Sequence, residues 1–359
     1  MAFSFLETVD QRAPHLQRLE PDAAIPGGVV EVFGSGMLTP EDATRFALPT
    51  AHIGEVSAAL TLCREDRVQL RVPAGAIAAD VTLARGVHRS NSLPLRVGVA
   101  FAEELHLVSN PALDADGNLY AMVSGPRGES VPVAIYRMTR DLETRPFVRD
   151  MLNVSSLAFD RDGYLYASSR AEGAVYRISP EGAITTYAEG MGVATGLAFD
   201  RDGDLFVGDR SGTIFKVTSN PDAPHTPRDL FVFATLEPSV AAYHMAFTDD
   251  GTLLVTAPGT SSNDCVYSIG EDGRASTFYR GLGRPQGLAL DAEGNVYVAA
   301  SLGGRRGIVR ITPDGRKAEL VLNGNEIVGL CFLEDGCAAI ATATTLYHID
   351  LGIEGRKLV

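Results

Sequence analysis
One acidic turn motif recurs six times between residues 113 and 341 of this 359-residue chain, and no other feature constrains the fold as strongly. Each copy has an apolar residue, an acidic turn that contains Gly, and a largely apolar run. The copies read LDADGNLYAM, FDRDGYLYAS, FDRDGDLFVG, FTDDGTLLVT, LDAEGNVYVA and FLEDGCAAIA. Their glycines, which repeat every 40 to 48 residues, are Gly117, Gly163, Gly203, Gly251, Gly294 and Gly336.

Each repeat carries signals for four strands. After the motif comes a run such as VYRI or IFKV, then a second turn such as SPEG or TPDG, and then a run such as TTYAEG. These runs are rich in β-branched and aromatic residues and are separated by Gly, Pro and Asp turns. Four strands at this period are typical of a propeller blade. We therefore predict an all-β chain in which residues 99–359 form a six-bladed β-propeller of four-stranded blades.

The propeller has to join its last blade to its first. Two segments are candidates for the missing outer strand of the last blade: residues 99–103 and the C-terminal RKLV. We favour residues 99–103, because pairing the two ends of the ring removes an exposed strand edge.

Residues 1–98 do not follow the repeat, and their strand signals predict a small β-sandwich. Runs such as VVEVF and VQLRV alternate and are separated by Gly and Pro turns. The segment resembles the IPT/TIG domain, which has an immunoglobulin-like fold. The residues that carry the resemblance are Pro26-Gly27-Gly28, Gly34, Gly36, Val72-Pro73-Ala74-Gly75 and Ser90-Asn91. The resemblance implies a spacer or contact domain without chemistry of its own.

The net charge of −14 argues against nucleic acid and anionic membranes as partners, because an acidic surface repels phosphate groups. No apolar run approaches the roughly 20 residues of a spanning helix. The first 20 residues lack the basic start and apolar core of a signal peptide. We expect a cytoplasmic protein.

The cysteines form no CxxC pair; they are Cys63, Cys265, Cys331 and Cys337. We interpret them as free thiols in a reducing compartment. The alternative is a disulfide between Cys331 and Cys337 across a hairpin.

The D-x-D-G turns raise the question of a calcium site. An EF-hand loop needs a Glu at its twelfth position, and counting from Asp160 and Asp200 that position holds Ala171 and Ser211. An apolar strand follows each turn. We therefore predict that these aspartates bond backbone N–H groups within the turn and that Gly supplies the positive φ.

Other catalytic motifs are missing from the sequence. No two histidines have the H-E-x-x-H spacing, and neither G-x-S-x-G nor a Walker A sequence occurs. GMGVATG, from Gly190, approaches a dinucleotide fingerprint, but no helix is predicted after it.

The repeat architecture directs attention to one end of the channel, where the innermost strands begin. The residues just before or at these starts are Ser109, Ser155, Thr195, Tyr243, Gln286 and Val328. The loop after each second strand adds Ser169, Arg170, Asp209, Arg210 and Ser301. His244 stands where four other repeats carry Gly, Ser or Asn, and its imidazole titrates near neutral pH. A histidine bonded inside a blade junction is the alternative.

Residues 99–359 resemble the six-bladed propellers of the gluconolactonase/regucalcin and NHL-repeat groups. The GLAFD-x-DG-x-L-[YF]-V units at residues 196–208 and 287–299 carry the resemblance. It implies a divalent metal in the channel, held by Glu, Asn and Asp, that polarises a lactone carbonyl. The matching positions hold no carboxylate: Ser109, Ser155, Thr195, Tyr243, Gln286 and Val328. Because hard divalent cations need several anionic oxygens, we expect no metal or other cofactor there.

Two functions follow. The favoured one is a module that binds a small molecule or a protein at the channel end, with ligand-binding residues Ser109, Ser155, Arg170, Thr195, Arg210 and Gln286. LFVGDRSGTIFKV, from Leu205, is closer to the NHL pattern, and that group consists mostly of binding modules. The alternative is a lactonase-like hydrolase or a lyase with His244 as acid/base and Tyr243 and Asp209 beside it. Arg170 and Arg210 would hold a carboxylate in that reaction.

Overall fold
The computed structural model describes residues 13–126, 128–223, 225–260 and 263–356. The chain divides into two compact units, residues 1–99 with 321–325 and residues 100–320 with 326–359. The sequence analysis placed the boundary after residue 98.

The first unit is built from short strands and one five-residue helix. Its elements are β1 (His15–Glu20), β2 (Ala23–Ala24), β3 (Val29–Ser35), α1 (Pro40–Thr44), β4 (Thr50–Ile53), β5 (Val56–Cys63), β6 (Arg67–Arg71), β7 (Ala79–Arg85), β8 (His88–Arg89) and β9 (Leu93–Val97). They share one apolar cluster, whose fully buried members include Val32, Leu70 and Leu83.

The strands of this unit form one hydrogen-bonded path, β1-β3-β6-β5-β4-β7-β9-β2. β4 pairs with β5 on one side and with β7 on the other, so it links the strands that a sandwich would place in two separate sheets. The predicted immunoglobulin-like sandwich is therefore not evident, although the all-β prediction for this segment is confirmed.

In the described residues, the second unit contains five separate four-stranded sheets, each ordered from an inner to an outer strand. The first is β11 (Ala112–Leu113), β12 (Leu119–Met122), β13 (Ile135–Met138) and β14 (Thr144–Val148). The second is β15 (Val154–Phe159), β16 (Leu165–Ser169), β17 (Ala174–Ile178) and β18 (Ile184–Ala188). The third is β19 (Ala194–Phe199), β20 (Leu205–Asp209), β21 (Thr213–Ser219) and β22 (Pro227–Thr235). The fourth is β23 (His244–Phe247), β24 (Leu253–Thr256), β25 (Asp264–Ile269) and β26 (Ala275–Leu282). The fifth is β31 (Ile327–Phe332), β32 (Cys337–Thr342), β33 (Leu346–Asp350) and β10 (Val99–Ala102).

The remaining repeat does not form a separate sheet. Its strands, β27 (Leu288–Leu290), β28 (Val296–Leu302), β29 (Arg305–Ile311) and β30 (Ala318–Asn323), follow the same order. The end of β30 belongs to the first unit, where Asn323 pairs with Ala24 of β2, so these strands end a 13-stranded sheet. The structure thus has five separate blades, and the prediction of six was wrong in this respect.

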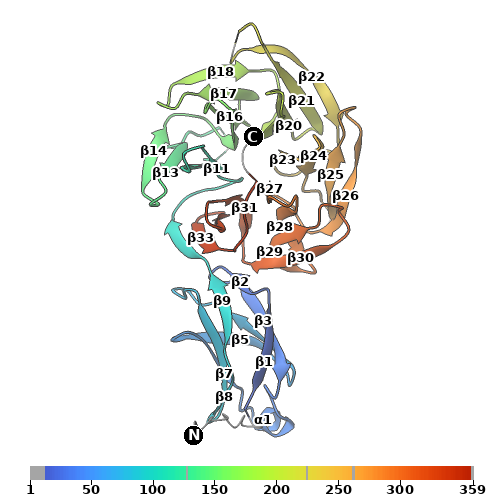
Figure 1. Ribbon diagram of the computed structural model, residues 1–359. Helices are drawn as coiled ribbons and strands as arrows, with labels where there is room; N and C mark the ends of the chain where they lie inside the picture. The colour runs from blue at the N-terminus through green and yellow to red at the C-terminus, as the bar shows by residue number, and fades with distance from the viewer. Residues whose placement is uncertain (1–12, 127, 224, 261–262, 357–359) are drawn as a thin grey trace, which may run out of the picture. The chain divides into compact units, whose positions relative to one another are not determined.

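Figure 1 shows the sheets of the second unit arranged around a common centre, with β11, β23, β27 and β31 near it. The last sheet is closed by β10, which pairs with β33. The prediction that residues near Val99 close the ring is therefore confirmed. The C-terminal alternative, RKLV, lies largely outside the described residues.

Aromatic contacts between neighbouring repeats explain part of the motif. The aromatic residue of the second strand packs edge-on against the Phe that ends the next inner strand. Ring centroids are 5.1 Å apart for Tyr120 and Phe159, and 4.9 Å apart for Tyr166 and Phe199. Phe206 with Phe247 and Tyr297 with Phe332 repeat the arrangement at 5.0 Å. Edge-to-face pairs of this kind add to the apolar burial between blades.

The turn prediction for the D-x-D-G elements is confirmed. Asp160 Oδ1 accepts hydrogen bonds from the backbone N–H groups of Asp162 at 3.0 Å and Tyr164 at 2.9 Å. Asp200 Oδ1 bonds Asp202 and Asp204 in the same way. Gly163 and Gly203 have φ near +82°, which a residue with a side chain rarely adopts.

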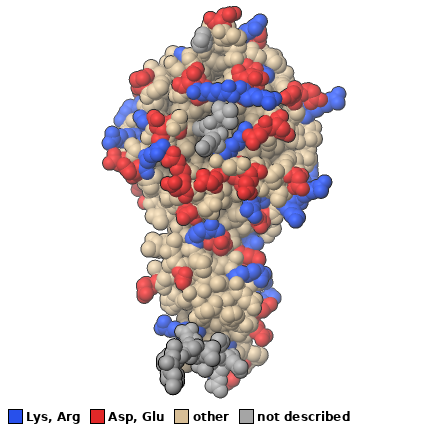
Figure 2. All heavy atoms as spheres, viewed as in Figure 1, with Lys and Arg blue, Asp and Glu red and all other residues tan. Residues whose placement is uncertain are grey.

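All four cysteines are free thiols, as the sequence analysis favoured. Figure 2 shows Asp and Glu side chains spread over the visible face, with Lys and Arg between them, in keeping with the net charge of −14. Among the described helices, none has the length and apolar character needed to cross a membrane.

Candidate functional site
The inner strand of each blade begins where the second strand ends, and this geometry collects the predicted residues at one end of the blades. The pairs Val154–Ser169, Ala194–Asp209 and His244–Thr256 show the register in three repeats. We call this end the channel mouth. Ser124, Arg170 and Arg210 occupy the same position of their repeats there, two residues beyond Met122, Ser168 and Gly208.

Ser109 and His244 meet although 135 residues separate them. The Oγ atom of Ser109 lies 3.1 Å from Nδ1 of His244. The next residue, Asn110, donates from Nδ2 to the carbonyl of Leu288 at 2.6 Å and accepts from the N–H of Leu330 at 3.1 Å. The segment before the first repeat thus contacts the inner strands of the last three repeats.

Two glycines of the repeat motif make room for this segment. A Cβ at Gly287 would stand 1.9 Å from Asn110 Oδ1, and one at Gly329 would stand 2.6 Å from the same atom. Gly at these two motif positions is therefore needed for close approach rather than for an unusual φ.

His244 is buried, with 4% of its surface exposed. Desolvation lowers the pKa of its imidazole to about 4, so the ring is neutral at physiological pH. Its Nε2 atom is buried and has no hydrogen-bond partner among the described residues. A neutral imidazole with one nitrogen on a hydroxyl and the other unsatisfied can exchange a proton or hydrogen-bond a ligand.

Tyr243 and Thr195 bind each other between the third and fourth repeats. The N–H of Tyr243 donates to Thr195 Oγ1 at 3.2 Å, and Thr195 Oγ1 donates to the carbonyl of Gly208 at 2.9 Å. The Tyr243 hydroxyl donates to the carbonyl of Glu237 at 2.5 Å. Burial raises the pKa of this phenol to about 12, so it remains protonated.

Asp209 holds the loop that carries Arg210. Its Oδ1 accepts from the N–H groups of Val193 at 3.1 Å and Ser211 at 3.0 Å, and its side chain is buried. No hydrogen bond between Asp209 and His244 occurs in the described part of the chain. Arg210 donates from Nη2 to the carbonyl of Val240 at 2.8 Å, while its Nε is buried without a partner among the described residues.

The other predicted ligand-binding residues are held by backbone or side-chain bonds. Ser155 Oγ donates to the carbonyl of Asn153 at 3.3 Å, and Arg170 Nη2 donates to the carbonyl of Gly125 at 3.1 Å. Gln286 Oε1 accepts from Nη2 of Arg306 at 2.6 Å. Burial lowers the pKa of Arg306 to about 10.

Two further residues of this region, Ser124 and Arg306, were not predicted from the sequence. Ser124 is fully buried, and its Oγ has no partner among the described residues. Its position, equivalent to Arg170 and Arg210, was the signal that would have found it. Arg306, in the LGGRRG loop, also bonds the carbonyl of Arg284 at 2.7 Å and that of Ile327. Nothing in the motif distinguishes this arginine from a solvated one.

The mouth does not suit the metal that the lactonase resemblance implies. Ser109, Ser155 and Thr195 offer hydroxyls that already bond protein groups, and the Oδ1 atom of the nearby carboxylate, Asp209, binds two backbone N–H groups. A hard divalent cation needs several anionic oxygens that are free to coordinate. We therefore derive no metal-dependent step at this site.

Comparison with known proteins finds one family model that matches part of the chain. Residues 165–337 match the family model described as the SMP-30/Gluconolactonase/LRE-like region. No curated protein matches the chain significantly.

Solved structures agree on the fold. A putative gluconolactonase is 19% identical, with a TM-score of 0.59, over 73% of this chain and 94% of its own. An auxiliary nutrient binding protein from Bacteroides thetaiotaomicron is 11% identical, with a TM-score of 0.54, over 94% of this chain and 98% of its own. A streptogramin B lyase is 13% identical, with a TM-score of 0.51, over 70% of this chain and 96% of its own. The second unit thus has a β-propeller fold, and residues 165–337 are similar to the SMP-30/Gluconolactonase/LRE-like family.

Proposed function
We propose that the protein is a binding module whose channel mouth holds a small anionic ligand. One observation carries the proposal: buried polar atoms at equivalent or neighbouring mouth positions lack partners among the described residues. These atoms are Ser124 Oγ, Arg210 Nε and His244 Nε2. Buried polar groups in proteins are nearly always hydrogen-bonded, so such atoms favour a ligand or ordered water at this position.

The charge of the mouth favours an anion. Arg170 and Arg210 lie at equivalent positions of neighbouring repeats, and Arg306 stands near Gln286 in a later repeat. A guanidinium matches the geometry of a carboxylate, and the pairing is stronger where water is partly excluded. The nutrient-binding neighbour, which aligns with nearly the whole chain, supports a binding function by analogy of fold alone.

A titration with small carboxylates tests the proposal. Acetate, citrate and gluconate are titrated into the whole protein by calorimetry. We expect at least one to bind saturably, and Arg210→Gln to weaken that binding about tenfold or more, the loss of roughly one charge-assisted hydrogen bond. Arg228→Gln, on the outer strand β22, is the matched control and should bind as the wild type does. Equal binding by both variants, or no saturable binding by the wild type, would contradict the proposal.

The alternative function is a lactonase-like hydrolase or a lyase, and the Ser109–His244 pair favours it. A hydroxyl bonded to a neutral imidazole resembles a nucleophile or acid beside its base. The family match over residues 165–337 and the lyase fold neighbour support this function by resemblance. Release of acid from glucono-1,5-lactone that is lost in His244→Asn would establish the enzyme and displace the binding module.

Two finer assignments also remain proposals. The first unit would serve as a spacer or contact domain of IPT/TIG type. The NHL relationship rests on the sequence pattern of residues 205–217.

A further inference from the structure

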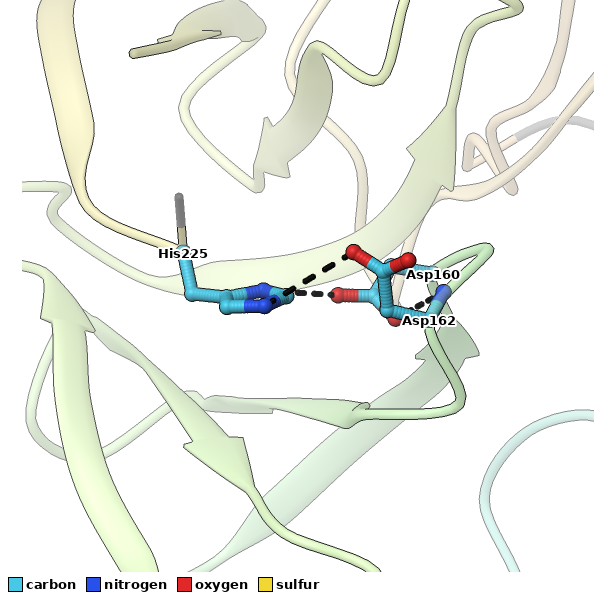
Figure 3. A group of neighbouring side chains, drawn as sticks. All are labelled: Asp160, Asp162 and His225. Carbon is cyan, nitrogen blue, oxygen red and sulfur yellow. Dashed lines mark hydrogen bonds and ion pairs between the residues drawn. The ribbon is translucent and has the colours of Figure 1, made fainter. Parts of the chain in front are cut away.

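A second group of titratable side chains lies at the other end of the blades, away from the channel mouth. Asp160 and Asp162 belong to the turn that follows β15, and His225 belongs to the loop between β21 and β22 of the next repeat. Figure 3 shows the imidazole facing both carboxylates. The group therefore connects two neighbouring repeats.

The three side chains offer ligand atoms in one small volume. His225 Nδ1 lies 3.6 Å from Asp160 Oδ2, and His225 Nε2 lies 3.6 Å from Asp162 Oδ2. One ligand atom from each residue lies within 4.8 Å of the other two. The ring of His225 packs on Tyr164, with centroids 4.4 Å apart, which orients the imidazole. Asp160 is fixed by its turn bonds through Oδ1 and by a hydrogen bond with the Tyr166 hydroxyl, and its Oδ2 faces the ring.

In the next repeat, a lysine compensates the negative charge of the equivalent acidic turn. There the carboxylates of Asp200 and Asp204 bind Lys216 Nζ, at 3.4 and 2.8 Å. The residue equivalent to Lys216 is Arg177, which instead donates to the backbone carbonyl of His225 at 2.8 Å. The turn of Asp160 thus faces an imidazole in place of a permanent ammonium charge.

We propose that Asp160, Asp162 and His225 bind a divalent transition-metal ion of the zinc class. Two carboxylates and one imidazole suit such an ion, whereas calcium and magnesium prefer oxygen ligands alone. Bonds of about 2.0–2.2 Å require the ligand atoms to move together slightly, and Asp162, whose side chain is 69% exposed, is free to rotate. Water completes the coordination. The ion joins the turn of one repeat to the loop of the next.

Binding of Zn²⁺ to the whole protein tests this site. After removal of metals with EDTA, calorimetry with Zn²⁺ alone should show one equivalent bound. Co²⁺ should give visible absorption bands at the same stoichiometry. His225→Gln and Asp162→Asn should each weaken Zn²⁺ binding by about 100-fold or more, the upper end of what loss of an outer-shell partner costs. The matched control is Asp202→Asn, the position of Asp162 in the repeat that carries Lys216, which should bind as the wild type does.

Several outcomes overturn the proposal. Absence of stoichiometric Zn²⁺ binding by the wild type does so directly. Unchanged binding by His225→Gln would place the ion elsewhere, for instance at the free cysteines. Equal losses in Asp162→Asn and Asp202→Asn would show that the turn of Asp160 is not specific. Circular dichroism of each variant confirms that its fold is intact. The proposal for this metal site does not depend on ligand binding at the channel mouth.

Discussion
His244 shows how a single side chain can be read in two ways. Its side chain is bulky and titratable at a position where other repeats carry small residues, which made it a candidate from the sequence. The structure gives it a hydroxyl partner, Ser109, a neutral ring and one unsatisfied nitrogen. These features fit both a buried junction and a ligand-binding group.

The pH dependence of stability follows from the burial of His244. Its pKa is about 4 in the folded protein and 6.5 in the unfolded chain, so below pH 6.5 the unfolded state takes up the proton first. The wild type should therefore lose about 2 kcal/mol of stability between pH 7 and pH 5, relative to His244→Asn. Urea unfolding of both proteins at the two pH values measures this difference.

An exposed histidine provides the control for that experiment. His15→Asn removes an imidazole that is exposed in the folded protein, so measuring it in parallel separates loss of the buried imidazole from loss of any imidazole. If the wild type and His244→Asn lose stability in parallel as the pH falls, the imidazole is not buried in a neutral state.

At the scale of elements, the acidic turns are the units that the repeat motif specifies. Asp291 shows the full set of bonds: Oδ1 accepts from the N–H groups of Glu293 and Asn295 at 2.9 and 2.8 Å, and Oδ2 accepts from the Tyr297 hydroxyl at 3.0 Å. Its side chain is almost completely buried. The turn therefore links the strand ends and the aromatic residue that packs on the next repeat.

Loss of this carboxylate should be costly. We expect Asp291→Ala to lower the free energy of unfolding by about 2–4 kcal/mol, because it leaves several buried donors unsatisfied. Asp314→Ala, in an exposed outer turn where Oδ1 bonds Thr312 and Arg316, should lower it by clearly less than Asp291→Ala does. Chemical denaturation measures both, and similar losses would show that burial does not set the cost.

The order of the strands and turns was the part of the structure that the sequence predicted best. The period of Gly117 to Gly336 determined the order of strands, and Tyr166 and Phe199 reveal why: the same aromatic contact recurs between repeats. Local patterns report local bonding, so the turns of Asp160 and Asp200 were predicted correctly. The pairing of Asn323 with Ala24 depends on residues 299 positions apart, and no local pattern encodes it.

The candidate sites were predictable only in part, for the same reason. Ser109 and His244 were placed at the mouth by their positions in the repeat, but their mutual hydrogen bond was not foreseen. Asp160 and Asp162 were noted as a turn, whereas His225 reaches them from a loop of variable length. Contacts that a loop makes across a repeat boundary are not periodic, so a repeat pattern does not predict them.

At the scale of the whole propeller, Asn110 connects repeats that lie far apart in the chain. It stands before the first repeat and bonds Leu288 and Leu330, which belong to the inner strands of the last two. The close approach depends on Gly287 and Gly329. A single amide therefore ties the beginning of the second unit to its end.

Removal of this amide should weaken the unit as a whole. We expect Asn110→Ala to lower the free energy of unfolding by about 2–4 kcal/mol, since the partner carbonyl and N–H are left without their bonds. Asn220→Ala, which loses only an exposed turn bond from the N–H of Asp222, should change it by less than about 1 kcal/mol. Thermal and urea unfolding compare the two, and equal stability of both variants would exclude a role for Asn110 in closure.

The pairing of β10 with β33 has a consequence for how this propeller can vary. The strand that enters the second unit and the strand that nearly ends it are neighbours in one sheet. The packing of the blades therefore does not determine where in the ring the chain begins. The same blades would pack in the same way if the chain began at another loop between them. Circular permutation, with new termini in an exposed loop between blades, is a change that such an arrangement tolerates.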